Sequence, residues 1–147
     1  MITQDHIKAS GSLRVVVYDK DGAVKEEHDF KNLVVTVGKT FVASRIVGVA
    51  SNIMSHMAVG SGTTAAAVGD TALQTELGRV TLASGTATSN VVTYTATFPA
   101  GTATGAITEA GILNAGSAGT LLCRTVFAVV NKGTDDAMSV TWTVTVN

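Results

Sequence analysis

The sequence predicts a mainly β protein: a two-sheet antiparallel β-sandwich, jelly-roll-like, with one embedded α-helix. About eight short segments rich in Val, Thr and aromatic residues are separated by turn residues, at the spacing typical of sandwiches and barrels. One segment alone has an apolar stripe of helical period, and strands do not alternate with helices, which disfavours a parallel sheet. The 147 residues suit one domain, which we divide into an N-terminal arm at residues 1–12 and a single β-sandwich domain at residues 13–147.

The first part of the domain predicts a hairpin, a helix and a short strand. Residues 13–18 and 23–30 are strand-like, and the Asp-Lys-Asp-Gly sequence between them is a typical hairpin turn. Residues 37–49 carry the helical stripe, and residues 54–59 form a short strand. These assignments place most of the charged side chains on the hairpin, which we therefore expect to be well solvated.

A loop and a short helical turn are expected next. Residues 60–69 consist mainly of Gly, Ser, Thr and Ala, which is typical of a loop. Asp70 is a good N-cap for a turn of helix that would direct Leu73 and Leu77 inward. Gly78 would end this turn.

The remainder of the chain reads as β structure. One segment, residues 120–130, is apolar on both faces, as a central strand would be. Two segments alternate apolar and polar residues with a clean period of two, which predicts strands with one buried face. The predicted strands are residues 79–83, 92–98, 106–113, 120–130 and 138–146, with a Ser-Gly-Thr turn at residues 84–86.

The composition limits the function classes. The net charge is −1, so a dedicated nucleic-acid binder is not expected. Only 14% of the residues are charged, which predicts a surface packed against copies of the chain or a larger partner. No apolar run is long enough to predict a membrane-spanning helix, and the polar N-terminal residues do not resemble a signal peptide.

Phosphate-binding motifs are incomplete in this chain. Gly38-Lys39-Thr40 lacks the earlier glycine of a P-loop, where Leu33 stands instead. Gly60-Ser61-Gly62 lacks the further glycine of a dinucleotide-binding loop, so a tight turn explains it better. We therefore expect no nucleotide or other cofactor.

Metal-binding and catalytic motifs are also incomplete. Asp19 and Asp21 resemble the opening of a calcium loop but lack the later ligands. The three histidines are far apart in the sequence, and Cys123 lies between apolar residues, where a buried, inert thiol is the usual case. We predict no metal site, no catalytic residue and no enzymatic activity.

Charged residues are rare in the second half of the chain. The five between Val59 and Val130 are Asp70, Glu76, Arg79, Glu109 and Arg124. A buried charge without a partner is costly, so we expect the last four to form ion pairs, within one subunit or across an interface. The alternative is that each side chain lies separately in water at the end of a strand.

Several blocks of the sequence resemble virion structural proteins of tailed bacteriophages. The blocks are Met57-Ala-Val-Gly-Ser-Gly-Thr-Thr-Ala-Ala, Gly69-Asp-Thr-Ala-Leu-Gln-Thr-Glu-Leu-Gly-Arg79, Ile107-Thr-Glu-Ala-Gly-Ile-Leu, Leu122-Cys-Arg-Thr-Val-Phe127, Asn131-Lys132 and the terminal strand. The similarity covers roughly residues 33–147. Within this group the chain resembles small capsid cement (decoration) proteins, which are jelly-roll β-sandwiches, and related tail-fibre domains.

This resemblance implies a function without an active site. A cement protein binds the major capsid protein, bridges capsomers and stabilises the head; it would be made in the host cytoplasm and lie on the capsid exterior of the virion. It would also bind itself as a dimer or trimer, and would need neither nucleic acid nor membrane. The expected capsid contacts are the arm, the hairpin turn and the loop, with Asp19, Asp21, Gly22, Gly60, Ser61 and Gly62.

Two other functions remain open from the sequence. A tail-fibre or baseplate subunit would attach to a host receptor, and exposed aromatic residues clustered for sugar stacking would indicate it. Trp142, Tyr18 and Tyr94 are the candidates, and the first and last of them lie in segments with an inward face. A small lectin-like or hydrolytic domain is the third class.

Overall fold

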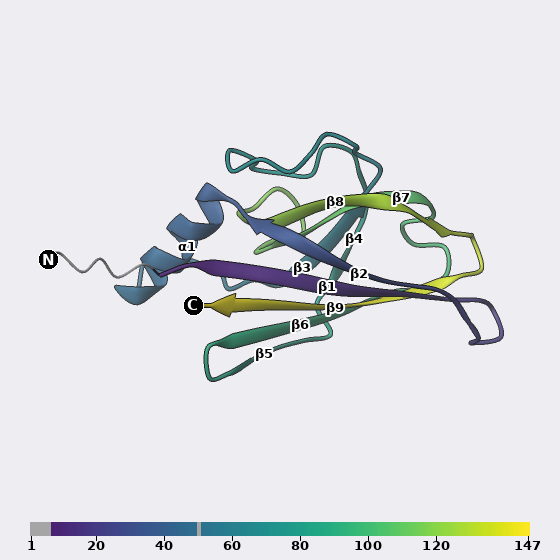
Figure 1. Ribbon diagram of the computed structural model, residues 1–147, viewed down its shortest axis with the longest axis horizontal. Helices are drawn as coiled ribbons and strands as arrows, with labels where there is room; N and C mark the ends of the chain where they lie inside the picture. The colour runs from purple at the N-terminus through teal and green to yellow at the C-terminus, as the bar shows by residue number, and fades with distance from the viewer. Residues whose placement is uncertain (1–6, 50) are drawn as a thin grey trace, which may run out of the picture.

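The computed structural model describes residues 7–49 and 51–147. Across these residues the chain forms one antiparallel sheet of nine strands, curled into a half-barrel, and one helix (Figure 1). The strand order is β4-β3-β7-β8-β2-β1-β9-β6-β5. The elements are β1 (Ala9–Tyr18), β2 (Val24–Val34), α1 (Thr36–Ile46), β3 (His56–Gly60), β4 (Glu76–Thr81), β5 (Ser84–Thr88), β6 (Val91–Phe98), β7 (Gly105–Leu113), β8 (Leu121–Lys132) and β9 (Ala137–Val146).

Strand β2 joins the two halves of the sheet. It pairs with β1 from Val24 to Asn32, and its last two residues, Leu33 and Val34, pair with β8. The mainly β class is confirmed, but the expected two-sheet sandwich is not, because these pairs make the sheet continuous. The alternation of apolar residues shows that a strand has a buried face; it does not show whether the opposite layer is a second sheet or the same sheet curled over.

The core fills the concave side of the half-barrel. Both halves contribute to it, for example Val15 of β1, Met57 of β3, Ile112 of β7 and Trp142 of β9, all at most 2% exposed. Where β2 and β8 diverge, the rings of Phe30 and Phe127 stack with centroids 4.3 Å apart. Burying this apolar surface supplies most of the stabilisation of the fold.

Several expected elements are present. The hairpin turn forms as predicted: the Asp19 carboxylate accepts the N–H groups of Asp21 and Ala23, and Gly22 has a φ of 82°, which favours glycine. β9 alternates as expected, with Met138 and Trp142 among its buried residues.

Other boundaries differ from the expectation. β1 begins at Ala9, so residues 9–12 of the expected arm belong to the sheet, while residues 1–6 lie outside the described part of the chain. The helix ends at Ile46 rather than at residue 49. Residues 84–88, expected to begin with a turn, form β5 along β6, since a run of Ser, Gly, Thr and Ala carries no alternation that would reveal a strand.

The helical turn expected at Asp70 is wrong. Residues 70–75 have no helical structure, and β4 begins at Glu76 and includes Gly78, which pairs with Val59. Leu77 is exposed rather than inward. The Asp70 carboxylate accepts hydrogen bonds from Ala67 and from a distant arginine instead of capping a helix, so a tertiary contact overrides the local preference.

Candidate functional site

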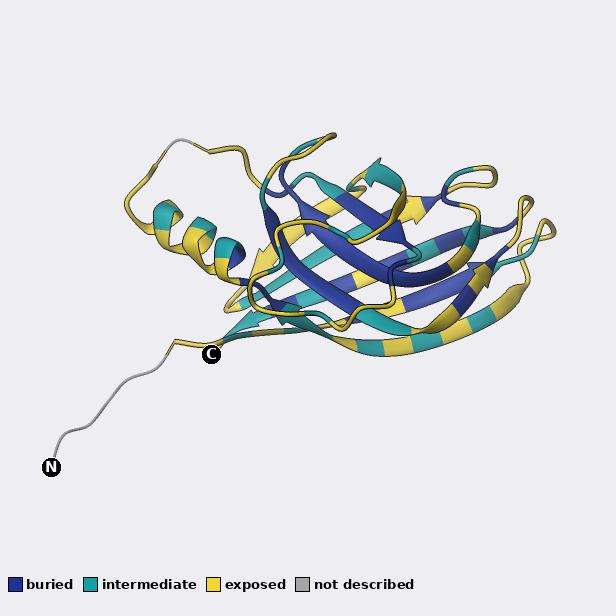
Figure 2. Cartoon of the chain, turned by 90° about the horizontal axis from the view of Figure 1, so that it is seen from above, coloured by how far each residue is buried: buried dark blue, intermediate teal, exposed yellow. Residues whose placement is uncertain are grey.

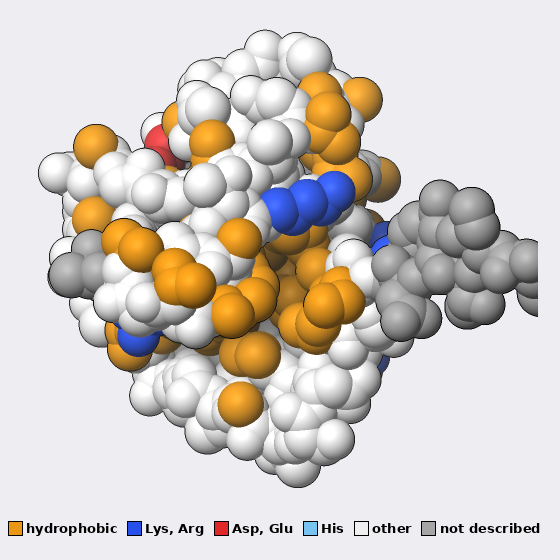
Figure 3. Space-filling view, turned by 90° about the vertical axis from the view of Figure 1, so that its left-hand side faces the viewer, with side chains coloured by type: hydrophobic (Ala, Val, Ile, Leu, Met, Phe, Trp, Pro, Cys, Tyr) orange, Lys and Arg blue, Asp and Glu red, His pale blue; other side chains and the backbone are white. Residues whose placement is uncertain are grey.

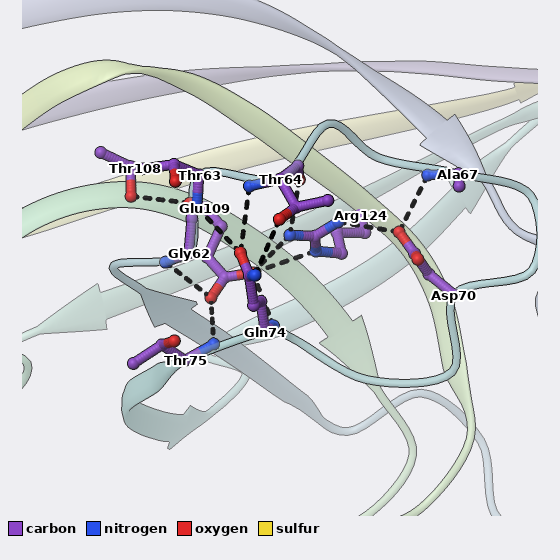
Figure 4. A network of polar contacts seen from close by, with 10 residues as sticks. All are labelled: Gly62, Thr63, Thr64, Ala67, Asp70, Gln74, Thr75, Thr108, Glu109 and Arg124. Carbon is purple, nitrogen blue, oxygen red and sulfur yellow. Dashed lines mark hydrogen bonds and ion pairs between the residues drawn. The ribbon is translucent and has the colours of Figure 1, made fainter.

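Two charged side chains lie side by side on the convex face of the sheet. Glu109 of β7 and Arg124 of β8 are almost completely buried there. The Arg124 Nε atom is 3.0 Å and its Nη2 atom 2.9 Å from Oε2 of Glu109, so one guanidinium edge faces the carboxylate (Figure 4). Such charge-assisted bonds are among the strongest polar contacts in proteins.

The carboxylate of Glu109 also holds both ends of the long segment at residues 61–75. Its Oε1 atom accepts the N–H groups of Gly62, at 3.0 Å, and Thr75, at 2.6 Å, and its Oε2 atom accepts that of Gln74, at 2.9 Å. The Thr108 hydroxyl donates to the carbonyl of Gly62 at 2.8 Å. The start and the end of the segment are therefore tied to the same point of the sheet (Figure 4).

Arg124 holds the middle of the segment. Its Nη1 atom donates to Asp70 at 2.8 Å and its Nη2 atom to the carbonyl of Thr64 at 3.1 Å. The Gln74 side chain closes the segment on itself by accepting the N–H groups of Thr63 and Thr64. Every buried charge of this cluster thus has partners, which is the condition for a buried polar network to stabilise a fold.

The cluster shifts the pKa values of its two carboxyl groups. Burial alone would raise the pKa of Glu109, but the N–H groups of Thr75 and Gln74 together with Arg124 outweigh burial and lower it. For Asp70 the opposing effect of burial is likewise outweighed, by the N–H of Ala67 and by Arg124, and its pKa is also lowered. Both groups are therefore held as carboxylates.

The other two residues expected to pair form a separate contact. Arg79 lies 2.7 Å from Glu76 on β4, and its guanidinium also donates to the carbonyls of Ala115 and Ala118. The structure thus brings Glu76, Arg79, Glu109 and Arg124 together as two pairs within one subunit, not as one cluster and not as isolated charges. Asp70, which also binds Arg124, was not among the residues expected to pair. Because charged residues are rare in this part of the chain, its charge alone could have suggested a partner.

The residues expected to contact a capsid have different surroundings. Asp21 and Gly22 are exposed at the hairpin tip, and Asp19 is half-buried. Gly60 and Gly62 are buried and Ser61 is half-buried, so the expectation that this turn presents a contact surface is corrected for the two glycines. The reason is the Glu109 carboxylate, which occupies the space that a side chain at position 62 would need.

A surface of a different kind covers the convex side of β1, β9, β6 and β5. Most outward residues of these strands carry hydroxyl groups and lie in register from strand to strand; the exceptions include Arg14, Val16 and Val91. Hydroxyl groups touch across the strands, as between Ser12 and Thr143 at 3.2 Å and between Ser84 and Thr95 at 2.6 Å. We call it the hydroxyl face; its residues are Ser10, Ser12, Ser84, Thr86, Thr88, Thr93, Thr95, Thr97, Ser139, Thr141, Thr143 and Thr145.

The charged side chain on this side of the four strands is Arg14 of β1, which lies beside Thr141 and pairs with Glu27 and Asp29 of β2. The Thr-x-Thr alternation of β6 and β9 is visible in the sequence, but the alignment of four strands depends on their register.

Comparisons with protein-family models, with curated proteins and with solved structures find no match to this chain.

The structure also locates other features that the sequence singled out. Cys123 is completely buried, and burial raises the pKa of its thiol strongly. In the described ranges, no three His, Cys, Asp or Glu side chains are grouped so that they could hold a metal ion. Nor does the described part of the chain contain a helix of the length and apolar character needed to cross a membrane.

Proposed function

We propose that this protein is a bacteriophage capsid cement protein that binds the major capsid protein on the exterior of the head and bridges neighbouring capsomers. The hydroxyl face is the observation that carries this proposal. A broad face whose one charged side chain, Arg14, is already paired can be covered by another protein at little cost of desolvating ions. Its hydroxyl groups can still form hydrogen bonds across a close contact, because each can donate and accept.

The scaffold beneath this face suits a structural role. The nine strands share one continuous hydrogen-bonded sheet, and the buried cluster of Glu109 and Arg124 holds the long segment at residues 61–75 against it. A rigid body loses little conformational freedom when it binds, so more of its contact energy goes into holding two capsomers together. The cement proteins that the sequence resembles are two-sheet jelly rolls, whereas this chain forms one curled sheet.

The tail-fibre alternative calls for an exposed aromatic platform. Trp142 is completely buried, and Tyr94 is half-buried opposite it on the concave side of the sheet. Burial raises the pKa of Tyr94 to about 12. With Trp142 buried, the half-buried Tyr94 alone does not form the exposed aromatic cluster that glycan recognition calls for, so we favour attachment to the shell over recognition of a glycan.

The test measures binding to purified phage particles. We expect the protein to be present in a simple ratio to the major capsid protein, and stripped particles to bind it again. The variant Thr86→Lys places a charge on the hydroxyl face and should weaken rebinding about tenfold, since covering that charge costs desolvation.

The matched control is Ser117→Lys, which places the same charge on an exposed residue of the turn between β7 and β8, outside the hydroxyl face and outside the expected contact loops. It should rebind like the unmodified protein. A handful of copies per particle would indicate a protein of the tail rather than of the shell. Its absence from particles would overturn the proposal. Equal binding by both lysine variants would show that the hydroxyl face is not the contact.

A further inference from the structure

One end of the half-barrel is apolar and open. There, α1 and the adjoining ends of β1 and β9 enclose a groove of about 550 Å³. Its lining includes Ile7, Ala9, Val42, Ile46 and Val146. Figure 3 looks directly onto this end and shows hydrophobic side chains around a hollow, with basic side chains beside it. We call this the helix end of the molecule.

The helix leaves much of its apolar surface without a partner. Gly38 is its one buried residue, while Ile46 is 78% and the following Val47 77% exposed. Ile7, on the opposite wall of the groove, is 81% exposed. Contiguous apolar surface of this kind marks a site of interaction rather than ordinary surface.

Among the described residues, the charged side chains around the groove are all basic. Lys8 and Lys39 line it, and Arg45 is exposed on the same helix. Between Asp29 and Asp70 the chain contains no acidic residue. A partner that enters the groove should therefore combine apolar side chains with carboxylates.

The opposite end of the same molecule has this combination. The β1–β2 turn with Asp19 and Asp21, and the β8–β9 turn with Asp135, lie at the far end of the long axis from α1 and the C-terminus (Figure 1). Exposed valines accompany them, Val24 on β2 and Val129 on β8. We call this the hairpin end.

Strands β2 and β8, which carry these valines, are linked near the tips: the backbone N–H of Asn131 on β8 donates to the carboxylate of Glu26 on β2 at 3.0 Å. Acidic side chains outnumber basic ones here: Lys20 stands between Asp19 and Asp21, Asp135 adds a third carboxylate, and Lys25 and Asp136 pair with each other. The hairpin end thus presents apolar side chains among carboxylates.

We propose that the helix end of one copy receives the hairpin end of a second copy, so that the protein associates head to tail. A symmetric contact between two helix ends would bring Lys8, Lys39 and Arg45 against their own copies, and like charges oppose it. A head-to-tail contact uses two different surfaces, and so leads to a closed ring or an open chain rather than to a two-fold dimer. This inference goes beyond the cement proposal, because it requires only this chain.

The test is the mass of the purified full-length protein in solution, measured by sedimentation velocity over a wide range of concentration. We expect oligomers that dissociate on dilution and in high salt, which screens the attraction between the two ends. The variants Lys39→Glu, at the helix end, and Asp21→Lys, at the hairpin end, should each weaken self-association about tenfold or more. Both side chains are exposed, so neither change should disturb the fold.

Mixing these two variants distinguishes the head-to-tail contact from other modes. In the mixture, the intact helix end of Asp21→Lys can meet the intact hairpin end of Lys39→Glu, and the two reversed ends can meet each other, so mixing should restore oligomers in which the two variants alternate. The double variant, with both charges reversed, should associate again. The control Ala65→Glu, away from both ends, should behave like the unmodified protein.

A protein that stays monomeric at every concentration would overturn the inference. Association that neither variant weakens would also overturn it, as would association in which mixing the variants restores nothing. Weakening by only one of the two variants would also overturn it, and would indicate a symmetric contact through that end. None of these results bears on binding to phage particles, so failure here and failure of the cement proposal can be told apart.

Discussion

The segment at residues 61–75 and the helix α1 are held in opposite ways. The segment has no helix and no strand, yet Glu109 binds both of its ends and Arg124 its middle, and its Leu73 packs against Ala58 and its buried neighbours. The helix is regular throughout, yet it buries only Gly38, with Val37 and Phe41 partly buried. Figure 2 shows α1 standing at one end of the half-barrel with most of its surface exposed.

Regular backbone structure and attachment to the core are therefore separate properties of a segment. A helix satisfies its own backbone hydrogen bonds and can stand almost alone, whereas an irregular segment needs partners for its N–H and C=O groups. Here two buried side chains supply many of those partners. The segment should therefore behave as part of the sheet, and the helix as an appendage to it.

The largest effect should come from removing the arginine of the cluster. Arg124→Ala leaves Glu109 buried without its cation and releases Asp70 and the carbonyl of Thr64. Breaking a buried ion pair by removing one partner costs about 3–5 kcal/mol, and urea unfolding would measure this loss. Arg79→Ala, at the more exposed pair, should cost less. A loss of under about half a kcal/mol for Arg124→Ala would show that the segment is not attached in this way.

A methyl group at the point of attachment should have the next largest effect. In Gly62→Ala the new Cβ atom would lie 2.5 Å from the Oε1 atom of Glu109, which its hydrogen bonds hold in place. Overpacking of this kind costs about 1–3 kcal/mol. Gly69→Ala, in the same segment, would meet nothing within 4 Å and is the matched control. Equal thermal stabilities for the two variants would contradict the close packing at Gly62.

Acid should loosen the segment before it affects the helix. The pKa of Glu109 is lowered in the folded protein from its ordinary value of 4.5, so its stabilising effect is present above that value and is lost as the pH falls through the folded pKa. Asp70 acts in the same direction, from an ordinary value of 3.8. Urea midpoints measured against pH should therefore fall at acid pH, and less steeply in Glu109→Gln. Identical pH profiles for the two proteins would exclude this coupling.

The smallest effect is expected at the helix. Ile46→Ser removes an apolar side chain that is already exposed, so the free energy of unfolding of the monomer should change by less than about 0.5 kcal/mol. Amide hydrogen exchange makes the contrast directly visible: the N–H groups of Gly62, Gln74 and Thr75 should exchange more slowly than those of the last helical turn. Faster exchange in the segment than in the last helical turn would contradict the view that the segment is held more firmly than the helix.

The sequence predicted the elements whose pattern is local. The Asp-Lys-Asp-Gly turn follows from the preferences of its own residues, and the alternation of β9 shows which of its faces is buried. The scarcity of charges between Val59 and Val130 correctly pointed to paired side chains. The scarcity of charges did not reveal which residues pair, because Glu109 and Arg124 meet only through the register of β7 and β8.

The errors have the same physical origin. Asp70 has the chemistry of a helix cap, but Arg124, 54 residues away in the chain, attracts its carboxylate. Gly60 and Gly62 resemble an exposed turn, but the Glu109 carboxylate buries them. β5 has no pattern of its own and becomes a strand because β6 offers it hydrogen bonds.

By itself, then, the sequence determined the mainly β class, the hairpin, the buried face of each patterned strand and the low charge of the surface, since all of these depend on neighbouring residues. Only the tertiary structure decided that β2 joins both halves into one sheet, that four strands align their hydroxyl groups, and that the molecule has an apolar, basic end and an acidic end. Those features depend on contacts between residues far apart in the chain, and the free energy of such contacts has no local signature.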